Sequence, residues 1–233
     1  MENDWKFDRP PSALELVQNN VFSNFLRTAL HVIVRLSFLC YHRFQTVHPE
    51  RLEGIQSKII AANHSSHLDV LALFSAFPLK DINRIRTFAA KDYFFKNPFL
   101  RCVGFFFANV IPIDRQGWSA ESLSYAGRAL AEGGIFIIFP EGTRSVDGEI
   151  HSFRPGIGML ALHYGVAMVP VYIDGTFSCQ KKGDCFPKPH KIRIIVGTPI
   201  DFSHLENNRQ SWETITSALE LRIKNLKEEI KHV

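Results

Sequence analysis

After Pro49, short apolar runs alternate with longer segments in which apolar residues recur every three or four positions. These spacings match the periods of β-strands and α-helices. The alternation predicts an α/β fold with a mixed central sheet flanked by helices. The predicted strands cover residues 58–62, 87–90, 105–113, 135–139, 167–173 and 191–197, and the predicted helices cover residues 68–77, 98–102, 120–132, 156–164 and 211–230.

A different pattern precedes this region. Residues 12–20 begin with a helix-start signature, and residues 21–41 form a second predicted helix with a single polar stripe, made of Asn24, Arg27, Thr28, His31 and Arg35. A spanning helix would bury two arginines, so we expect an amphipathic helix in the membrane interface. The alternative is a helix packed on the soluble core with its stripe in water. We therefore divide the chain into an N-terminal helical membrane-associating element, residues 1–48, and an α/β domain, residues 49–233.

The distribution of charge favours contact with a membrane surface and argues against a nucleic-acid partner. Residues 16–49 contain three arginines and no acidic residue, which suits an anionic bilayer. The net charge of +4 is too small to indicate nucleic acid, so no nucleic-acid partner is expected. The four cysteines show no zinc or redox spacing, and no signal peptide is evident. We expect a membrane-associated protein on the cytoplasmic face, with no bound metal.

The segment 63–69 carries the first candidate chemistry. It follows the predicted strand 58–62, so His64 lies at a strand end and Asp69 lies in the first turn of the next helix. Histidine is suited to accept a proton near neutral pH, and a carboxylate can orient the imidazole. The alternative is a capped helix start, with Ser66 as N-cap and Asp69 at N3.

Two further segments end predicted strands with charged residues. After strand 135–139, Gly142 permits close backbone approach, and Thr143 and Arg144 offer donors for a phosphate or an oxyanion. The alternative is a turn closed by a salt bridge from Glu141 to Arg144. Arg115, after strand 105–113, is a second possible phosphate ligand or an ordinary surface charge. A proline within strand 167–173 predicts an edge strand or a bulge.

Four blocks in this order, residues 63–69, 113–115, 139–144 and 169–171, resemble the glycerolipid acyltransferase family. Its best-known members are the lysophosphatidic acid (1-acylglycerol-3-phosphate) acyltransferases. The resemblance spans residues 63–173 and does not extend specifically to residues 178–233. It implies a membrane-associated enzyme with His64 as general base and Asp69 as its partner. It assigns binding of the phosphate-bearing acceptor to Arg115, Glu141, Gly142, Thr143 and Arg144.

The expected reaction follows from this resemblance. A fatty acyl chain passes from an acyl thioester to the free hydroxyl of lysophosphatidic acid, giving phosphatidic acid. The thioester, acyl-CoA or an acyl carrier protein, is a co-substrate, and no separate cofactor is expected. Membrane lipids and the acyl donor are the expected partners, and the oligomeric state is left open. Other lysolipids, glycerol-3-phosphate or a non-phosphate acceptor remain alternatives.

Three rival functions are less well supported by the residues. A serine hydrolase or thioesterase would use Ser65 or Ser66 beside His64, but the chain has no Gly-x-Ser-x-Gly elbow. A metal hydrolase could use His64, His67 and Asp69, but the spacing matches no zinc motif. A non-enzymatic membrane-binding protein would explain residues 21–41, but not the polar residues at successive strand ends.

Overall fold

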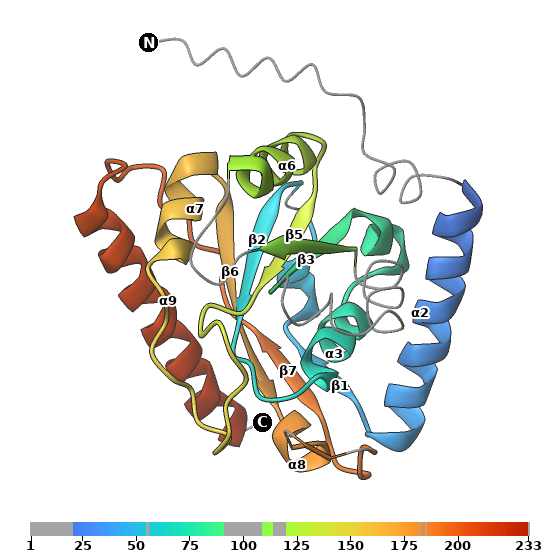
Figure 1. The fold of residues 1–233 in the computed structure, drawn as a ribbon. Helices are drawn as coiled ribbons and strands as arrows, with labels where there is room; N and C mark the ends of the chain where they lie inside the picture. Colours follow the sequence, from blue (N-terminus) through green and yellow to red (C-terminus); the bar gives the residue numbers. More distant parts are fainter. Residues whose placement is uncertain are drawn as a thin grey trace.

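The computed structural model describes residues 21–54, 56–90, 109–113, 120–181, 183–184 and 186–232. The predicted helices at residues 12–20 and 98–102 lie outside these ranges. The described chain forms one sheet with helices on both of its faces (Figure 1). The predicted mixed central sheet flanked by helices is therefore confirmed, whereas the division at residue 48 remains a prediction.

The sheet contains seven strands in the order β1-β7-β6-β2-β5-β3-β4. Strands β2 to β6 are parallel to one another, β7 is antiparallel to β6, and β1 is parallel to β7. The strands are β1 (Gln45–Val47), β2 (Lys58–Ala62), β3 (Ile85–Ala90), β4 (Val110–Ile113), β5 (Ile135–Ile138), β6 (Ala167–Asp174) and β7 (Arg193–Val196). The carboxyl ends of β2 to β6 consequently share one edge of the sheet.

Helices α2 and α3 cover one face, and α6, α7 and α9 cover the other. Successive β2 residues alternate between the two cores: Ile60 joins the first and Ile59 joins the second. The helical elements are α2 (Val21–Tyr41), η1 (Pro49–Leu52), α3 (Leu68–Ala76), η2 (Leu79–Arg84), α6 (Ala120–Ala131), α7 (Gly156–Tyr164), α8 (Thr176–Cys179), α9 (Arg209–Glu229) and η3 (Ile230–His232).

The orientation of α2 differs from the expected one. Its polar stripe faces the protein: Arg27 and His31 are buried, and the helix packs on α3 and η2. Arg27 donates to Oδ1 of Asn83, on η2, at 3.2 Å, and His31 stacks on Phe74 of α3 with ring centroids 4.6 Å apart. The exposed side is apolar and includes Val21, Phe22, Phe25, Leu26, Ile33, Leu36, Leu39 and Tyr41. The stripe therefore lies neither in water nor toward lipid headgroups.

Burial changes the ionisation of Arg27 without removing its charge. Desolvation, followed by the positive charge of Arg86, lowers the pKa of Arg27 to about 10, so the guanidinium is protonated at pH 7. A charged group this deeply buried requires hydrogen-bond partners, and Asn24 and Asn83 supply two of them. The polar residues of α2 thus fix the helix to the domain. No helix in the described ranges has a stretch long and apolar enough to cross a bilayer.

The expectation of an edge strand at Pro170 is wrong, whereas the pairing beside it is irregular, as in a bulge. Val171 pairs with Val196, but Met168 bridges Ile200, one residue farther along than a regular antiparallel ladder would place it. The strand of Pro170, β6, lies between β2 and β7 inside the sheet. The carbonyl of Pro170 accepts from the N–H of Gly197 at 2.8 Å, so the proline nitrogen also faces the β7 side. The β6–β7 ladder begins at the next residue, Val171, and the bonds to β2 need no N–H from Pro170. The proline therefore removes no donor from the central ladder.

Candidate active site

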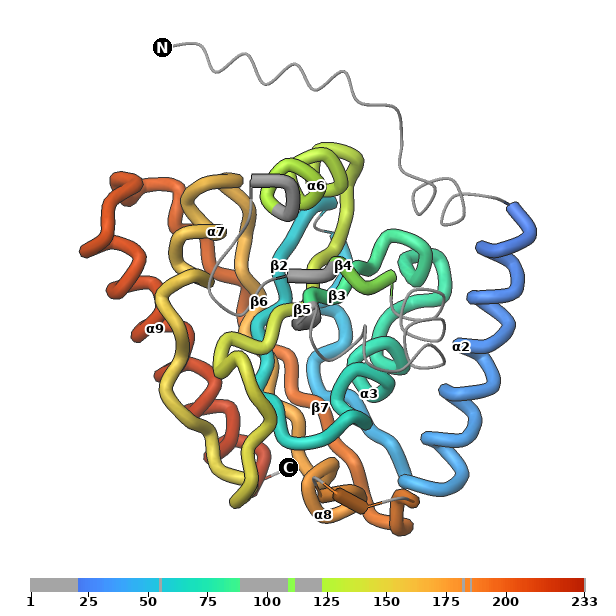
Figure 2. Tube along the Cα trace, in the orientation of Figure 1, coloured from blue at the N-terminus to red at the C-terminus, as the bar shows by residue number. Residues whose placement is uncertain are grey.

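The loops that follow β2, β5 and β6 meet at the carboxyl edge of the parallel strands (Figure 2). Open α/β sheets bind ligands at this edge. The first loop carries His64 and leads into α3, the second carries residues 139–145, and the third leads into α8. Parallel pairing of β2 with both β5 and β6 brings these three distant segments together.

His64 and Asp69 form a direct pair. Nδ1 of His64 lies 2.8 Å from Oδ2 of Asp69. The Asp69 side chain is fully buried, whereas the His64 side chain retains 18% exposure. An ionised Asp69 accepts the Nδ1 proton, so Nε2 of His64 is left as the basic nitrogen. This is the arrangement expected of a general base and the carboxylate that orients it.

A single oxygen of Asp69, Oδ2, contacts three successive residues of the loop. Besides His64, Oδ2 accepts the backbone N–H groups of Ser65 at 2.6 Å and Ser66 at 2.8 Å. Within the described residues, Oδ1 is buried and has no hydrogen-bond partner. The helix begins at Leu68, and Ser66 accepts the Leu68 N–H at 3.2 Å, as an N-terminal cap does. The contact with His64 and the bonds at the helix start therefore share a single oxygen of Asp69, and the catalytic role of Asp69 remains a prediction.

The second loop forms hydrogen bonds with both the N–H and the carbonyl of His64. The N–H of His64 donates to Oε1 of Glu141 at 2.8 Å, and the N–H of Ser145 donates to the carbonyl of His64, also at 2.8 Å. Oε2 of Glu141 accepts from the N–H of His151 at 3.1 Å. Both oxygens of this buried carboxylate therefore contact backbone amides, and no salt bridge to Arg144 is present among the described residues. A contact between Glu141 and substrate remains a prediction.

The ring of Phe139 completes the support of the base. It stacks on the His64 imidazole with centroids 4.0 Å apart and planes 18° apart. Because Phe139 directly follows β5, its position is set by the sheet. The imidazole is thus held by Asp69 at its Nδ1 atom and by Phe139 on one face.

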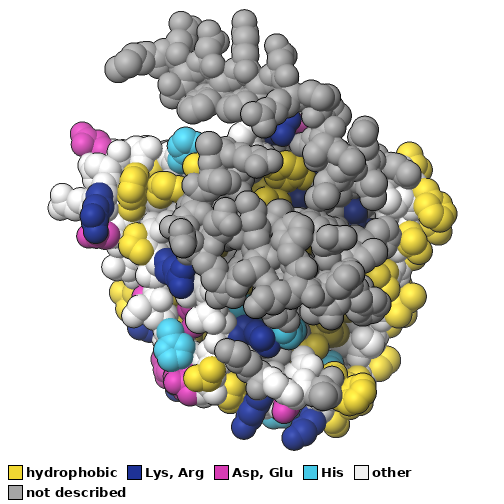
Figure 3. Space-filling view, in the orientation of Figure 1, with side chains coloured by type: hydrophobic (Ala, Val, Ile, Leu, Met, Phe, Trp, Pro, Cys, Tyr) yellow, Lys and Arg dark blue, Asp and Glu magenta, His cyan; other side chains and the backbone are white. Residues whose placement is uncertain are grey.

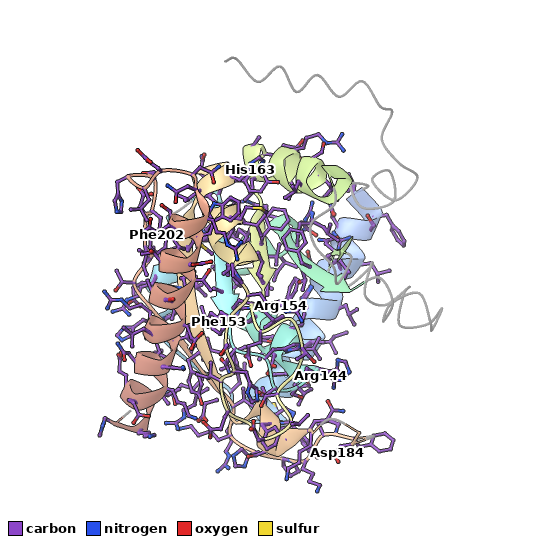
Figure 4. The ribbon with its side chains drawn as sticks, turned by 60° about the vertical axis from the view of Figure 1, so that its left-hand side comes forward. Arg144, Phe153, Arg154, His163, Asp184 and Phe202 are labelled. Carbon is purple, nitrogen blue, oxygen red and sulfur yellow. The ribbon has the colours of Figure 1, made fainter. Side chains whose placement is uncertain are left out.

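Arg154 lies against the Gly142 backbone, a contact that the sequence patterns did not indicate. Gly142 has a φ of 71°, and a Cβ atom there would lie 2.7 Å from Nε of Arg154. Glycine is required for both reasons. Thr143 is exposed and Arg144 is half-exposed, and Figure 4 shows Arg144 and Arg154 on the segment that connects β5 to α7. Arg154 lies outside the motif blocks, so only its proximity in the fold reveals it.

Behind the base, polar contacts tie β2 to β6. The Asn63 side chain donates to the carbonyl of Ile173 at 3.0 Å and accepts its N–H at 2.7 Å. Ser65 Oγ lies 3.1 Å from Oγ1 of Thr176, and both side chains are buried. Ser65 therefore contacts Thr176, and Ser66 contacts its own helix start, so neither serine is hydrogen-bonded to the imidazole as a nucleophile would be.

A second histidine, His67, lies near His64, and its surroundings favour the neutral form. Desolvation, together with the positive charge of Arg144 and of His64, lowers the pKa of His67 to about 4. The ring still reaches solvent. His67 is therefore neutral at pH 7, and it adds no charge beside the base.

Arg115 lies outside the described residues, so its expected place near Arg144 remains a prediction. Across the part of the chain that the structure describes, no group of three or more His, Cys, Asp or Glu side chains is arranged to hold a metal ion. In that part of the chain, the polar partner of the Nδ1 atom of His64 is Asp69.

An apolar cavity of about 290 Å³ opens between α2, α3 and the loop after α8. Leu68, which lines it, directly precedes Asp69 in α3. The other lining residues are Val34, Ser37, Phe38, Tyr41, His42, Leu71 and Pro187. An apolar space therefore begins one residue from the His64–Asp69 pair, on the side where α2 covers the domain.

The chain is similar in sequence to known proteins. The chain is 28% identical over 188 residues to the chloroplastic 1-acyl-sn-glycerol-3-phosphate acyltransferase LPAT1 of Arabidopsis thaliana, covering 77% of this chain and 51% of that protein. It is 28% identical over 211 residues to a 1-acyl-sn-glycerol-3-phosphate acyltransferase of Bacillus subtilis, covering 88% and 97%. The chain spans about half the length of the plant and algal relatives.

A solved structure shares the fold. The crystal structure of PlsC from Thermotoga maritima, titled a 1-acyl-sn-glycerophosphate (LPA) acyltransferase, superposes with a TM-score of 0.63 at 23% identity, covering 89% of this chain and 87% of that one. The family model described as Acyltransferase matches residues 43–174, which include His64, Asp69 and the loop 139–145. Since this match covers more than half of the sequence, the chain belongs to the acyltransferase family.

Proposed function

We propose that the protein transfers a fatty acyl chain from an acyl thioester to the free hydroxyl of lysophosphatidic acid, giving phosphatidic acid. The observation that carries this proposal is the 2.8 Å contact between Nδ1 of His64 and buried Asp69, beside a loop with Thr143 and Arg144. The names of the Arabidopsis and Bacillus relatives support the same acceptor. Acyl-CoA or an acyl carrier protein supplies the acyl group, and no other cofactor takes part.

The chemistry needs one base and no covalent intermediate. Nε2 of His64 accepts the proton of the acceptor hydroxyl as its oxygen bonds to the thioester carbonyl carbon. The tetrahedral oxyanion then collapses, the carbon–sulfur bond breaks, and the thiolate takes the proton from His64. Asp69 stabilises the imidazolium between these two transfers. Arg144 and Thr143, with Arg115, bind the acceptor phosphate and keep its hydroxyl beside Nε2.

We also propose that the protein works on a membrane surface, at its cytoplasmic face. The exposed side of α2 presents Phe22, Phe25 and Ile33, which are 71%, 70% and 63% exposed. A contiguous apolar surface of this kind is typical of a membrane or protein contact. The cavity between α2 and α3 lies directly beneath this helix, so an acyl chain entering from the bilayer has an apolar path toward Leu68.

The decisive experiment is an acyl-transfer assay with purified protein, both kinds of thioester donor and a panel of acceptors. The panel contains lysophosphatidic acid, other lysolipids, glycerol-3-phosphate and a neutral alcohol. His64→Ala should lose about 10²–10⁴-fold in rate, whereas the control His163→Ala, at an exposed position of α7, should not. Wild-type activity in His64→Ala would refute the mechanism.

A second comparison tests the phosphate clamp. Arg144→Ala should lose far more activity with a phosphate-bearing acceptor than with a neutral one. Equal losses on both acceptors would refute the assignment of Arg144 to phosphate, while leaving the role of His64 untouched.

A further inference from the structure

In the loop between α8 and β7, the described residues 180, 181, 183, 184 and 186–191 are held by several backbone hydrogen bonds. The N–H of Lys188 donates to the carbonyl of Cys179 at 2.7 Å and closes the base of the loop. Near its tip, Oδ2 of Asp184 accepts the N–H of Lys181 at 3.0 Å, and the N–H of Asp184 donates back to the Lys181 carbonyl at 3.1 Å. Reciprocal bonds of this kind hold a turn in one shape. The described side chains on the loop are therefore presented in a defined arrangement.

This loop exposes both an aromatic ring and positive charge. Phe186 is 83% exposed, and Lys181 and Lys188 are exposed as well. The segment 180–191 contains four lysines and one aspartate, a formal net charge of +3. A phenylalanine left in water among lysines is unfavourable in isolation, and this combination is typical of surfaces that meet anionic lipid.

The loop is fixed to the carboxyl end of α2. The hydroxyl of Tyr41 donates to the carbonyl of Pro187 at 3.3 Å, and the N–H of Ile192 donates to the carbonyl of His42 at 3.0 Å. Figure 3 shows hydrophobic side chains along the right-hand edge of the molecule, over α2, with Lys and Arg side chains beside their lower end. The apolar face of α2 and the basic loop thus form one continuous border.

The loop also lies next to the candidate active site. It continues from α8, whose first residue, Thr176, contacts Ser65 beside the catalytic histidine. A surface that touches both α2 and this loop therefore faces the carboxyl edge of the sheet, where the acceptor must enter. Docking by α2 alone would leave the molecule free to rotate about the helix axis, and a second contact at the loop would fix its orientation.

We propose that residues 180–191 are a second membrane contact, in which Phe186 enters the bilayer and the lysines bind anionic headgroups. The proposal rests on the membrane docking of α2 proposed above. An acidic carrier protein would also complement the lysines. The bilayer is favoured because the exposed ring of Phe186 is continuous with an apolar helix face, whereas recognition of an acidic protein needs the charge alone.

The test measures binding of the full-length protein to vesicles of phosphatidylcholine alone and of phosphatidylcholine mixed equally with phosphatidylglycerol. Each lysine near an anionic surface contributes about fivefold to binding, so a Lys181→Ser/Lys188→Ser variant should bind mixed vesicles about 30-fold more weakly. Its binding to phosphatidylcholine alone should not change. The control, Lys224→Ser/Lys231→Ser near the end of the chain, removes the same charge and should bind like the wild type.

Two further variants separate the contacts. Phe186→Ser should weaken binding to both kinds of vesicle, and Phe25→Ser, on α2, should do so independently of the loop. Unchanged binding of the double lysine variant to mixed vesicles would overturn the proposal. It would also be overturned if that variant bound normally but lost rate only with an acyl carrier protein donor, since the loop would then recognise the carrier.

Failure of the proposed reaction gives a different result. Activity measured on lysophosphatidic acid dispersed in neutral detergent micelles does not depend on anionic bilayers, so the double lysine variant should acylate it at the wild-type rate. An inactive wild type in that assay would refute the acyl-transfer function, whatever the vesicles show. Normal activity with unchanged vesicle binding would refute only the membrane role of the loop.

Discussion

Replacement of Asp69 by asparagine separates the charge of this residue from its hydrogen bonds. Oδ2 accepts from His64, Ser65 and Ser66, whereas Oδ1 is buried without a partner among the described residues. In Asp69→Asn, the amide oxygen must take the Oδ2 position, because the NH₂ group there would face two backbone N–H donors. The oxygen then still accepts the Nδ1 proton of His64. We therefore expect the variant to keep the correct imidazole tautomer and the helix cap, and to lose only the negative charge.

The magnitude follows from that charge. At a separation of about 4 Å and an effective dielectric constant of about 20, an imidazolium and a carboxylate attract each other by about 4 kcal/mol. This attraction exists only while His64 carries the proton, so its loss raises the barrier rather than weakening substrate binding. At about 1.4 kcal/mol per tenfold change, kcat should fall by about 10³-fold with little change in KM. Asp69→Ala should also lose folding stability, since each buried amide that it leaves unpaired costs about 1–3 kcal/mol.

The assay is steady-state acyl transfer by the wild type, Asp69→Asn, Asp69→Ala and His64→Ala, with thermal unfolding measured in parallel. Asp69→Asn should unfold close to the wild-type temperature, and Asp69→Ala should unfold several degrees lower. A wild-type kcat in Asp69→Asn would refute the charge argument. An Asp69→Asn enzyme that folds normally but is as inactive as His64→Ala would show that the amide is turned and the tautomer lost.

Three other variants probe the loops that surround the base. Glu141→Gln offers one acceptor to two buried amides, and kcat should fall by about 10²-fold because the base is displaced; an unchanged kcat would contradict this role. Burial raises the pKa of Glu141 above its ordinary value of 4.5, so the folded state binds the proton more tightly. The wild type should therefore lose stability relative to Glu141→Gln as the pH rises from about 4.5 through the raised pKa, which urea titrations at several pH values would measure. Gly142→Ala forces a Cβ onto Arg154 at a φ of 71° and should raise KM for phosphate-bearing acceptors while destabilising the fold by about 1–3 kcal/mol; a normal KM would show that the loop tolerates the shift. Asn63→Ala removes the two side-chain hydrogen bonds from Asn63 to the backbone of Ile173 in β6 and should lower the free energy of unfolding by about 2–5 kcal/mol in chemical denaturation, and a loss below 1 kcal/mol would mean that water replaces them.

Much of the architecture follows from local patterns. The limits of α2, β2 and α7 match the prediction, and those of the other predicted elements that the structure describes differ by a few residues, because helix and strand periods are visible within a single segment. The strand β1 was missed: at three residues, Gln45–Val47 is too short to show a period, and its pairing with β7 is a property of the sheet. The interior position of Pro170 was also missed, since strand order depends on contacts between distant segments.

The candidate site divides in the same way. His64 and Asp69 are only five positions apart, one in the loop before α3 and the other in its first turn, so their closeness in the sequence already places them near each other. The bonds of Glu141 to His64 and His151 depend on how β5 lies beside β2, which no local pattern reveals. The polar stripe of α2 is a further example. Its period is visible in the sequence, but whether it faces water or protein depends on Asn83 and Phe74, about fifty residues away.

The bonds between the two catalytic loops also bear on acceptor choice. The N–H and the carbonyl of His64 are both held by the segment 141–145, which carries Thr143 and Arg144. The base and the proposed phosphate ligands therefore move as one unit, and the distance from a bound phosphate to Nε2 is fixed by short backbone hydrogen bonds. In lysophosphatidic acid the free hydroxyl is on the carbon next to the one that bears the phosphate. A rigid link between clamp and base selects acceptors with that separation, because any other separation would place either the phosphate or the hydroxyl out of reach. The acyl chain, which we propose to enter the apolar cavity on the α2 side, need not contribute to this selection.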